Sequence, residues 1–247
     1  MATLFTLSYS PWSERARWVL LHHRWNFEER RHVPFLGEFA LRRAARRWSG
    51  KVSVPLLVDG DTSVQDSLEI ARYVDARGEA ERLLLPDCET SIGELNKLAE
   101  SVVDAFRGRG IQLVAQDPEF ALTFTPQVLR SMPLAAAASR FGSGLLARKY
   151  GVDMHGTRER IRDGIAAMRA TLGGKQYVND RFSYADILIA TTLHLMAPVG
   201  DQYIRMDPIM QRAWRDDELA REFSDLISWR DELYARHRPA SVPNVAA

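Results

Sequence analysis

The chain has 247 residues, and 46% of them are hydrophobic, which is enough for one large core or two modest ones. Its 33 Lys and Arg residues nearly balance 32 Asp and Glu residues, so the overall charge does not favour nucleic acid or an anionic membrane as a partner. Cys88 is the only cysteine, which excludes an intramolecular disulfide, a Cys-x-x-Cys redox pair and a cysteine-based zinc site.

Targeting and metal-binding motifs are not expected in this sequence. The first residues lack the basic and apolar regions of a signal peptide, and no segment reaches the roughly 20 apolar residues needed to span a bilayer. The six histidines show no ligand spacing such as His-Glu-x-x-His. We therefore expect a soluble cytoplasmic protein without a metal centre.

Residues 1–85 predict a domain of mixed strands and helices. The Asp-Gly pair at 59–60 is typical of a tight turn between two strands. The predicted strands are 3–8, 27–33, 54–58 and 62–64, and the predicted helices are 13–23, 35–48 and 68–74. This βαβαββα order suits an α/β domain of the thioredoxin-like type.

Residues 92–247 predict an all-α domain, joined to the first by a linker at 86–91. After Cys88 the apolar residues follow helical spacing, with almost no strand alternation. The tail beyond Pro239 has little to bury, and we expect it to be flexible. The predicted helices are 92–106, 125–150, 157–172, 184–196 and 219–236.

Asp66-Ser67 stands between the predicted hairpin and the helix that follows it. Asp and Ser are favoured helix N-caps, so the pair could serve only to bind unpaired backbone N–H groups. The same groups can also hold a zwitterion: a carboxylate binds an ammonium, while a hydroxyl, backbone N–H groups and the positive end of a helix bind a carboxylate. The pair therefore also indicates a site for an amino-acid-like ligand.

Four short segments together resemble the glutathione-binding domain of the glutathione S-transferases. They are Ser10-Pro11, Arg15-x-Arg17, Val54-Pro55 and Asp66-Ser67, and the resemblance continues through most of the chain. It implies a thioredoxin-like domain followed by an all-α domain, with glutathione as the co-substrate.

The resemblance also implies a role for each ligand-binding residue. A proline before a strand is in itself an ordinary strand start; in the family, Pro55 would follow a cis peptide bond, and the backbone of Val54 would pair with the cysteinyl part of glutathione. Asp66 would bind the γ-glutamyl ammonium, and Ser67 its carboxylate. The glutathione-binding residues implied in this way are Lys51, Val54, Pro55, Gln65, Asp66 and Ser67, with Gln65 in an assisting role and Lys51 near the glycine carboxylate.

Ser10 is the leading candidate for the catalytic hydroxyl, and Ser13 is the second. Ser-Pro at a helix start is also an ordinary cap. A thiolate at this position would be stabilised by the helix dipole and by a hydroxyl hydrogen bond. Aligned on Arg15-x-Arg17, Ser10 takes the position of the catalytic Cys or Ser of the omega- and zeta-like transferases. Serine cannot form a mixed disulfide with glutathione, so activation of the glutathione thiol is favoured over reductase chemistry.

Ser183 and Asp186 have the spacing of a capping box at the start of an apolar helix. The arrangement resembles the folding motif of the transferase C-terminal domain. We expect both residues to stabilise the fold and to take no part in the chemistry.

The favoured function is that of a glutathione S-transferase-like enzyme, expected to be a homodimer, that activates the glutathione thiol for attack on a small hydrophobic electrophile. The alternative is a non-catalytic glutathione-binding or scaffold protein of the same fold, because a fold does not fix a function. The sequence does not identify the electrophile.

Overall fold

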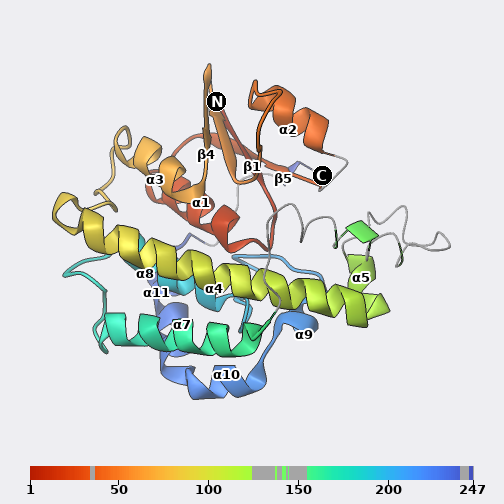
Figure 1. Ribbon diagram of the computed structural model, residues 1–247. Helices are drawn as coiled ribbons and strands as arrows, with labels where there is room; N and C mark the ends of the chain where they lie inside the picture. Colours follow the sequence, from red (N-terminus) through yellow and green to blue (C-terminus); the bar gives the residue numbers. More distant parts are fainter. Residues whose placement is uncertain are drawn as a thin grey trace.

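The structure is a computed structural model that describes residues 1–33, 37–123, 155–239 and 245–246, together with residues 137, 141, 142 and 144. It has two halves (Figure 1): a sheet with three helices, and below it a group of helices led by the long helix α4.

The N-terminal half has the predicted order of elements. Its sheet order is β4-β3-β1-β2-β5, in which β5 (Val245–Ala246) comes from the end of the chain. Strand β1 is parallel to β2 and antiparallel to β3, and β3 is antiparallel to β4. The elements are β1 (Ala2–Thr6), α1 (Pro11–His22), β2 (Phe27–Arg31), α2 (Glu38–Ala44), β3 (Leu56–Asp59), β4 (Thr62–Gln65) and α3 (Ser67–Asp75). The thioredoxin-like fold predicted for this half is confirmed.

Side chains alternate between the two faces of the sheet, and each face has its own helices. Leu4 and Leu57 belong to the large core that contains the buried residues of α1 and α3. Their neighbours Phe5 and Leu56 point to the other face, where Leu41 of α2 joins a smaller cluster. This period-two alternation places α1 and α3 on one face and α2 on the other.

Helix α2 is shorter than the helix predicted over residues 35–48. It ends at Ala44, and Arg46 has φ of 52°, a left-handed conformation that does not continue a helix. Trp48 therefore lies outside the helix, and its side chain is exposed.

The second half consists of helices within the described residues, so the predicted all-α character is confirmed for them. The elements are η1 (Pro86–Cys88), α4 (Glu89–Gln116), α5 (Pro118–Thr123), α7 (Thr157–Leu172), α8 (Tyr184–Leu193), α9 (Pro208–Trp214), α10 (Asp217–Glu222) and α11 (Ser224–His237). The helix predicted over 157–172 matches α7. The prediction over 125–150 falls almost entirely outside the described residues.

Two predicted helix ends were wrong for physical reasons. Helix α4 continues ten residues past Phe106 because its glycines do not break it: a Cβ on Gly110 would lie 2.6 Å from the Trp214 ring, so glycine permits this close approach.

The single helix predicted over 219–236 is two helices, α10 and α11, separated at Phe223, whose φ and ψ of −112° and 33° are not helical.

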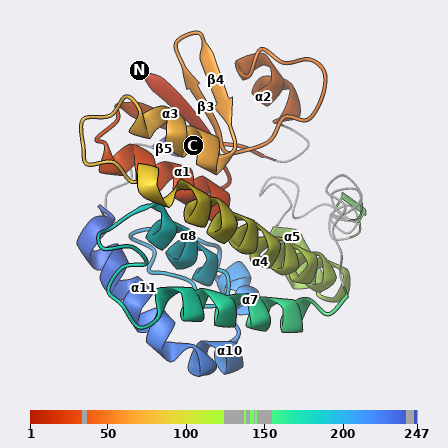
Figure 2. The ribbon, with the colours of Figure 1, turned by 60° about the vertical axis from the view of Figure 1, so that its left-hand side comes forward.

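Helix α8 is the centre of the helical half. All ten of its residues are buried, and it lies between α4, α7 and α11 (Figure 2). Its first turn carries the predicted capping box: the Asp186 carboxylate accepts hydrogen bonds from the backbone N–H and the hydroxyl of Ser183, at 2.8 and 3.0 Å. The predicted cap is confirmed.

The C-terminal tail returns to the sheet. Two of its residues, β5 (Val245–Ala246), pair in parallel with β2. Among the helices described, none has the length together with the apolar character that crossing a bilayer requires.

Candidate functional site

Three loops meet at one edge of the sheet. Since β1 and β3 are antiparallel, as are β3 and β4, the end of β1, the start of β3 and the end of β4 lie side by side; Phe5 is in register with Leu56, and Leu56 with Gln65. The segment after β1 holds Ser10, and Asp66 follows β4. The structure therefore brings the separate segments singled out in the sequence to the same edge (Figure 1).

Ser10 and Ser13 differ in what their hydroxyls do. Ser10 occupies the N-cap position of α1 in an extended conformation, but its side chain makes no capping hydrogen bond, and the residue is 6% exposed. The hydroxyl of Ser13 is fully buried and accepts a hydrogen bond from the backbone N–H of Leu7 at 3.0 Å. Ser13 is thus engaged in holding the loop, whereas Ser10 adjoins the positive end of a twelve-residue helix.

The residues just before β3 have the backbone conformation that the resemblance implied. The Val54-Pro55 peptide bond is cis. The side chain of Gln65 accepts a hydrogen bond from the backbone N–H of Ser53 at 2.9 Å, which fixes the segment leading into this bond. Lys51 lies in the exposed loop before it.

Asp66 caps α3 and keeps part of its carboxylate available. It has φ of 75°, and its Oδ1 accepts hydrogen bonds from the backbone N–H groups of Leu68 and Glu69 at 2.8 and 3.3 Å. In the described part of the chain no hydrogen bond reaches Oδ2, and the residue is exposed. The N-cap interpretation is confirmed, and one carboxylate oxygen is left over for a cation.

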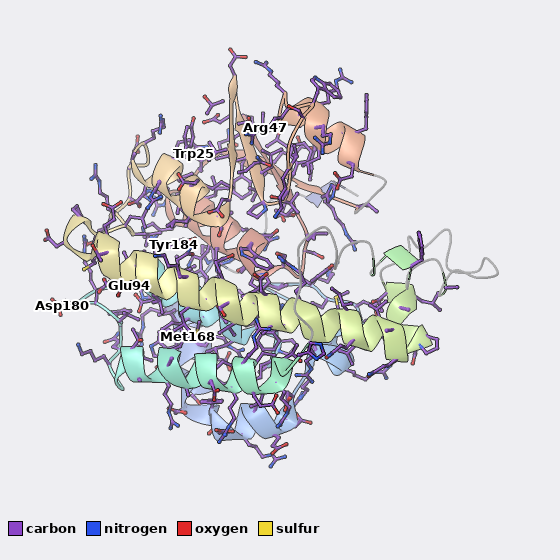
Figure 3. All side chains as sticks on the ribbon, viewed as in Figure 1. Trp25, Arg47, Glu94, Met168, Asp180 and Tyr184 are labelled. Atoms are coloured by element: carbon purple, nitrogen blue, oxygen red, sulfur yellow. The ribbon has the colours of Figure 1, made fainter. Side chains whose placement is uncertain are left out.

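Ser67 is less accessible than sequence reasoning assumed. Its hydroxyl is fully buried and has no hydrogen-bond partner among the described residues. The Tyr184 hydroxyl of α8 adjoins it, although the two groups do not complete a well-formed hydrogen bond. Burial raises the pKa of Tyr184 far above its usual range, with a smaller opposing effect from Arg15, so the phenol stays protonated. Figure 3 labels Tyr184 where the two halves meet.

A polar cluster beneath the site was missed from sequence. Trp12 donates its indole N–H to both oxygens of Glu100, at 2.7 and 2.6 Å. Arg15, which is fully buried, donates to the same carboxylate at 2.6 Å and to the hydroxyls of Thr191 and Thr192 at 3.2 Å. The cluster joins α1 to α4 and α8, so it holds the start of α1 in place.

Arg107 contacts this polar cluster at Trp12, and Tyr9 precedes Ser10 in the chain. The Arg107 guanidinium lies 4.5 Å from the centre of the Trp12 ring, a cation–π contact. Burial raises the pKa of Tyr9 to about 12, and the charges of Arg31 and Arg107 oppose this rise. Tyr9 therefore stays protonated at neutral pH. The spacing of Glu100, Asp104 and Arg107 places all three on one face of α4, which was a signal available in the sequence.

Comparisons with known proteins agree with this geometry. Residues 4–82 match the family described as "Glutathione S-transferase, N-terminal domain". No curated protein matches the chain.

Solved structures match over nearly the whole chain. A glutathione S-transferase from Methylobacterium radiotolerans, in complex with glutathione sulfonate, is 19% identical, with a TM-score of 0.60 over 100% of this chain and 98% of that chain. One from Methylobacillus flagellatus with glutathione bound is 17% identical, with a TM-score of 0.62 over 96% of each chain. One from Ceriporiopsis subvermispora in complex with glutathione is 16% identical, with a TM-score of 0.64 over 99% of each chain.

At these identities the solved structures establish the fold. Residues 4–82 are similar to the N-terminal domain of the glutathione S-transferases, and the chain as a whole has the fold of the solved transferases.

Proposed function

We propose that this protein is a glutathione transferase of the serine type. The observation that carries the proposal is the strand register, which brings Asp66, Val54 and Ser10 to one edge of the sheet. An ammonium would bind the remaining oxygen of Asp66, and the cysteinyl backbone would pair with Val54. The sulfur would then lie toward Ser10, with Pro55, Gln65, Ser67 and Lys51 supporting the rest of the ligand.

The proposed mechanism requires little covalent chemistry from the protein. The glutathione thiol loses its proton to solvent, and the thiolate is stabilised by the Ser10 hydroxyl as donor and by the positive end of α1. The sulfur then forms a bond to the electrophilic carbon of a small apolar substrate, with loss of a leaving group or addition across a double bond. Holding both substrates together supplies much of the rate.

Glutathione as co-substrate is supported by the solved relatives. The proteins from Methylobacillus flagellatus and Ceriporiopsis subvermispora were determined with glutathione bound. The Ser67 hydroxyl is buried, so a ligand carboxylate can reach it only if neighbouring side chains shift.

Replacing Asp66 by Asn tests the proposal. Asn keeps a capping oxygen and tolerates the left-handed backbone of this position, but it loses the charge. We expect glutathione affinity, measured by calorimetry, to fall by about tenfold, the loss typical of a charged hydrogen bond. The melting temperature should change little.

The control is Asp163→Asn, which alters an exposed carboxylate on α7. It should leave affinity unchanged. Equal glutathione affinity in wild type and Asp66→Asn would refute the assigned site. Binding without turnover of any electrophile would favour the alternative, a glutathione-binding protein that performs no catalysis.

We also propose a cytoplasmic homodimer. A groove of about 240 Å³ between α3 and α4 is lined by the apolar residues Leu68, Leu84, Leu85, Pro86 and Ile92, and by the charged residues Arg72, Arg82, Asp75 and Glu89. This surface of apolar residues and both signs of charge is a suitable subunit contact, and the sedimentation mass in solution tests it.

A further inference from the structure

Basic groups surround the entrance to the proposed thiol site. Strands β1 and β2 are parallel, so their carboxyl ends meet at one edge, and Arg31 at the end of β2 is in register with Thr6 at the end of β1. Tyr9 lies in the segment between β1 and α1. The charge of Arg31 acts on the Tyr9 hydroxyl, as does that of Arg107 from α4. Two guanidinium groups from separate elements thus lie within electrostatic reach of the residue before Ser10.

Trp12, two residues after Ser10, holds Arg107 by a contact with its ring. The edge of the indole is held by Glu100, and the guanidinium lies over its face at 4.5 Å. Arg107 also pairs with Asp104 at 2.7 Å, one turn back on α4. Asp104 is 49% exposed, and an exposed pair of this kind contributes little energy. A guanidinium has five N–H donors, so one arginine can donate to more than one anion.

Among the described residues, the two carboxylates of α4 nearest to Arg107 are paired with cations. Glu100 is bound by the buried guanidinium of Arg15, and Asp104 by Arg107. Within the described ranges no carboxylate pairs with Arg31, which is exposed. In this part of the described chain Arg31 is therefore a basic group without a matching carboxylate, near the positive end of α1.

We propose that the electrophile of this enzyme carries a carboxylate, and that Arg107 and Arg31 bind this group. The inference rests on the proposed function. It adds an acidic group to the small apolar substrate expected from sequence. In a substitution reaction, the glutathione sulfur would form a bond to the carbon that holds chloride, and chloride would leave with the bonding electrons. The carboxylate would remain on the conjugate, next to the two arginines.

A matched pair of glutathione conjugates tests the proposal by calorimetry and does not depend on turnover. One conjugate derives from a chloronitrobenzoate with chlorine para to the carboxylate, and the other from the corresponding uncharged benzamide. We expect the wild-type protein to bind the carboxylate conjugate about tenfold more tightly, as one charged hydrogen bond provides. Added salt should reduce this preference, because the arginines are partly exposed.

Arg107→Gln and Arg31→Gln should each lower the carboxylate preference by about threefold or more. Arg162→Gln is the matched control, since it removes an exposed arginine that pairs with Glu222 on the helical half; it should leave the preference unchanged. If Arg107 acts only through packing on Trp12, both conjugates will weaken alike and the preference will stay the same, which would overturn the inference.

The calorimetric measurements distinguish failure of this inference from failure of the proposed function. Glutathione binding without any preference for the carboxylate conjugate would overturn this inference alone. Failure to bind glutathione or either conjugate would overturn the proposed function and this inference together.

Discussion

Ser10, the N-cap of α1, and Ser13, in its first turn, have different surroundings. The Ser13 hydroxyl accepts a backbone hydrogen bond from Leu7 and is fully buried, so its removal would affect the loop before the helix. Ser10 makes no side-chain cap, which leaves its proton available to a ligand atom at the helix start. These contacts favour Ser10 as the thiolate donor.

Ser10→Ala should therefore raise the pKa of the bound glutathione thiol by about one unit, since it removes a donor to the thiolate. Turnover at neutral pH should fall accordingly. Ser13→Ala should instead lower the free energy of unfolding by about 1 kcal/mol, because a buried N–H loses its acceptor. The measurement is the ultraviolet absorbance of bound thiolate as a function of pH in both variants. If the pKa of the bound thiol shifts only in Ser13→Ala, Ser13 is the thiolate donor and Ser10 is not.

At the scale of elements, the start of α8 depends on one buried carboxylate. Asp186 accepts hydrogen bonds from Ser183 and from the backbone N–H of Val178, at 2.8 Å. Burial raises the pKa of Asp186 to about 6, although these hydrogen bonds oppose the rise. The folded protein therefore binds this proton more tightly than the unfolded chain, and the stability that Asp186 contributes decreases as the pH rises from about 4 to about 6.

Asp186→Ala makes this dependence measurable. The variant should be less stable than wild type, because two buried N–H groups lose their acceptor. Relative to the variant, wild type should lose up to about 2–3 kcal/mol of unfolding free energy between pH 4 and pH 6.5, from two pKa units. Urea denaturation across this range tests it, with Asp163→Ala, an exposed carboxylate on α7, as control. An advantage in unfolding free energy of wild type over Asp186→Ala that grows with pH would contradict the expected direction of this dependence.

At the scale of the whole molecule, buried ion pairs join the end of the chain to its beginning. Arg238 donates to Glu14 at 2.8 Å across 224 residues of sequence. Arg17 pairs with Glu14 and with Glu29, and Glu29 also accepts from the hydroxyl of Thr6 at 2.6 Å. Burial alone would raise the pKa of Glu29, but the Arg17 guanidinium lowers it below its usual range. Two acids and two bases thus balance in a buried cluster.

Arg238→Ala should lower the free energy of unfolding by about 2–4 kcal/mol, because it leaves Glu14 buried with one cation instead of two. Arg236→Ala is the control: it removes an exposed arginine of the same turn and should change stability by less than about 0.5 kcal/mol. Arg238→Lys should restore part of the loss. Urea denaturation of the three variants gives the comparison, and equal effects of the two Ala variants would show that the cluster does not stabilise the chain.

The sequence by itself determined the order of the strands and helices from β1 to α3, the capping of α3 by Asp66 and the capping box at Ser183. Each of these depends on spacing or on residues close in the chain, and such signals are local. The same locality explains the errors, since the continuation of α4 through Gly110 depends on a ring from α9 that no local pattern reveals.

Only the tertiary structure decided which polar groups meet. Arg15 is a charged residue that sequence reasoning would place at a surface, yet it is fully buried, because Glu100 and two threonines of α8 supply its partners from distant segments. The covering of Ser67 by Tyr184, and the position of Arg107 over Trp12, likewise arise where the two halves pack together. Burial and pairing across that interface depend on contacts distant in the chain, so they could not be derived from spacing.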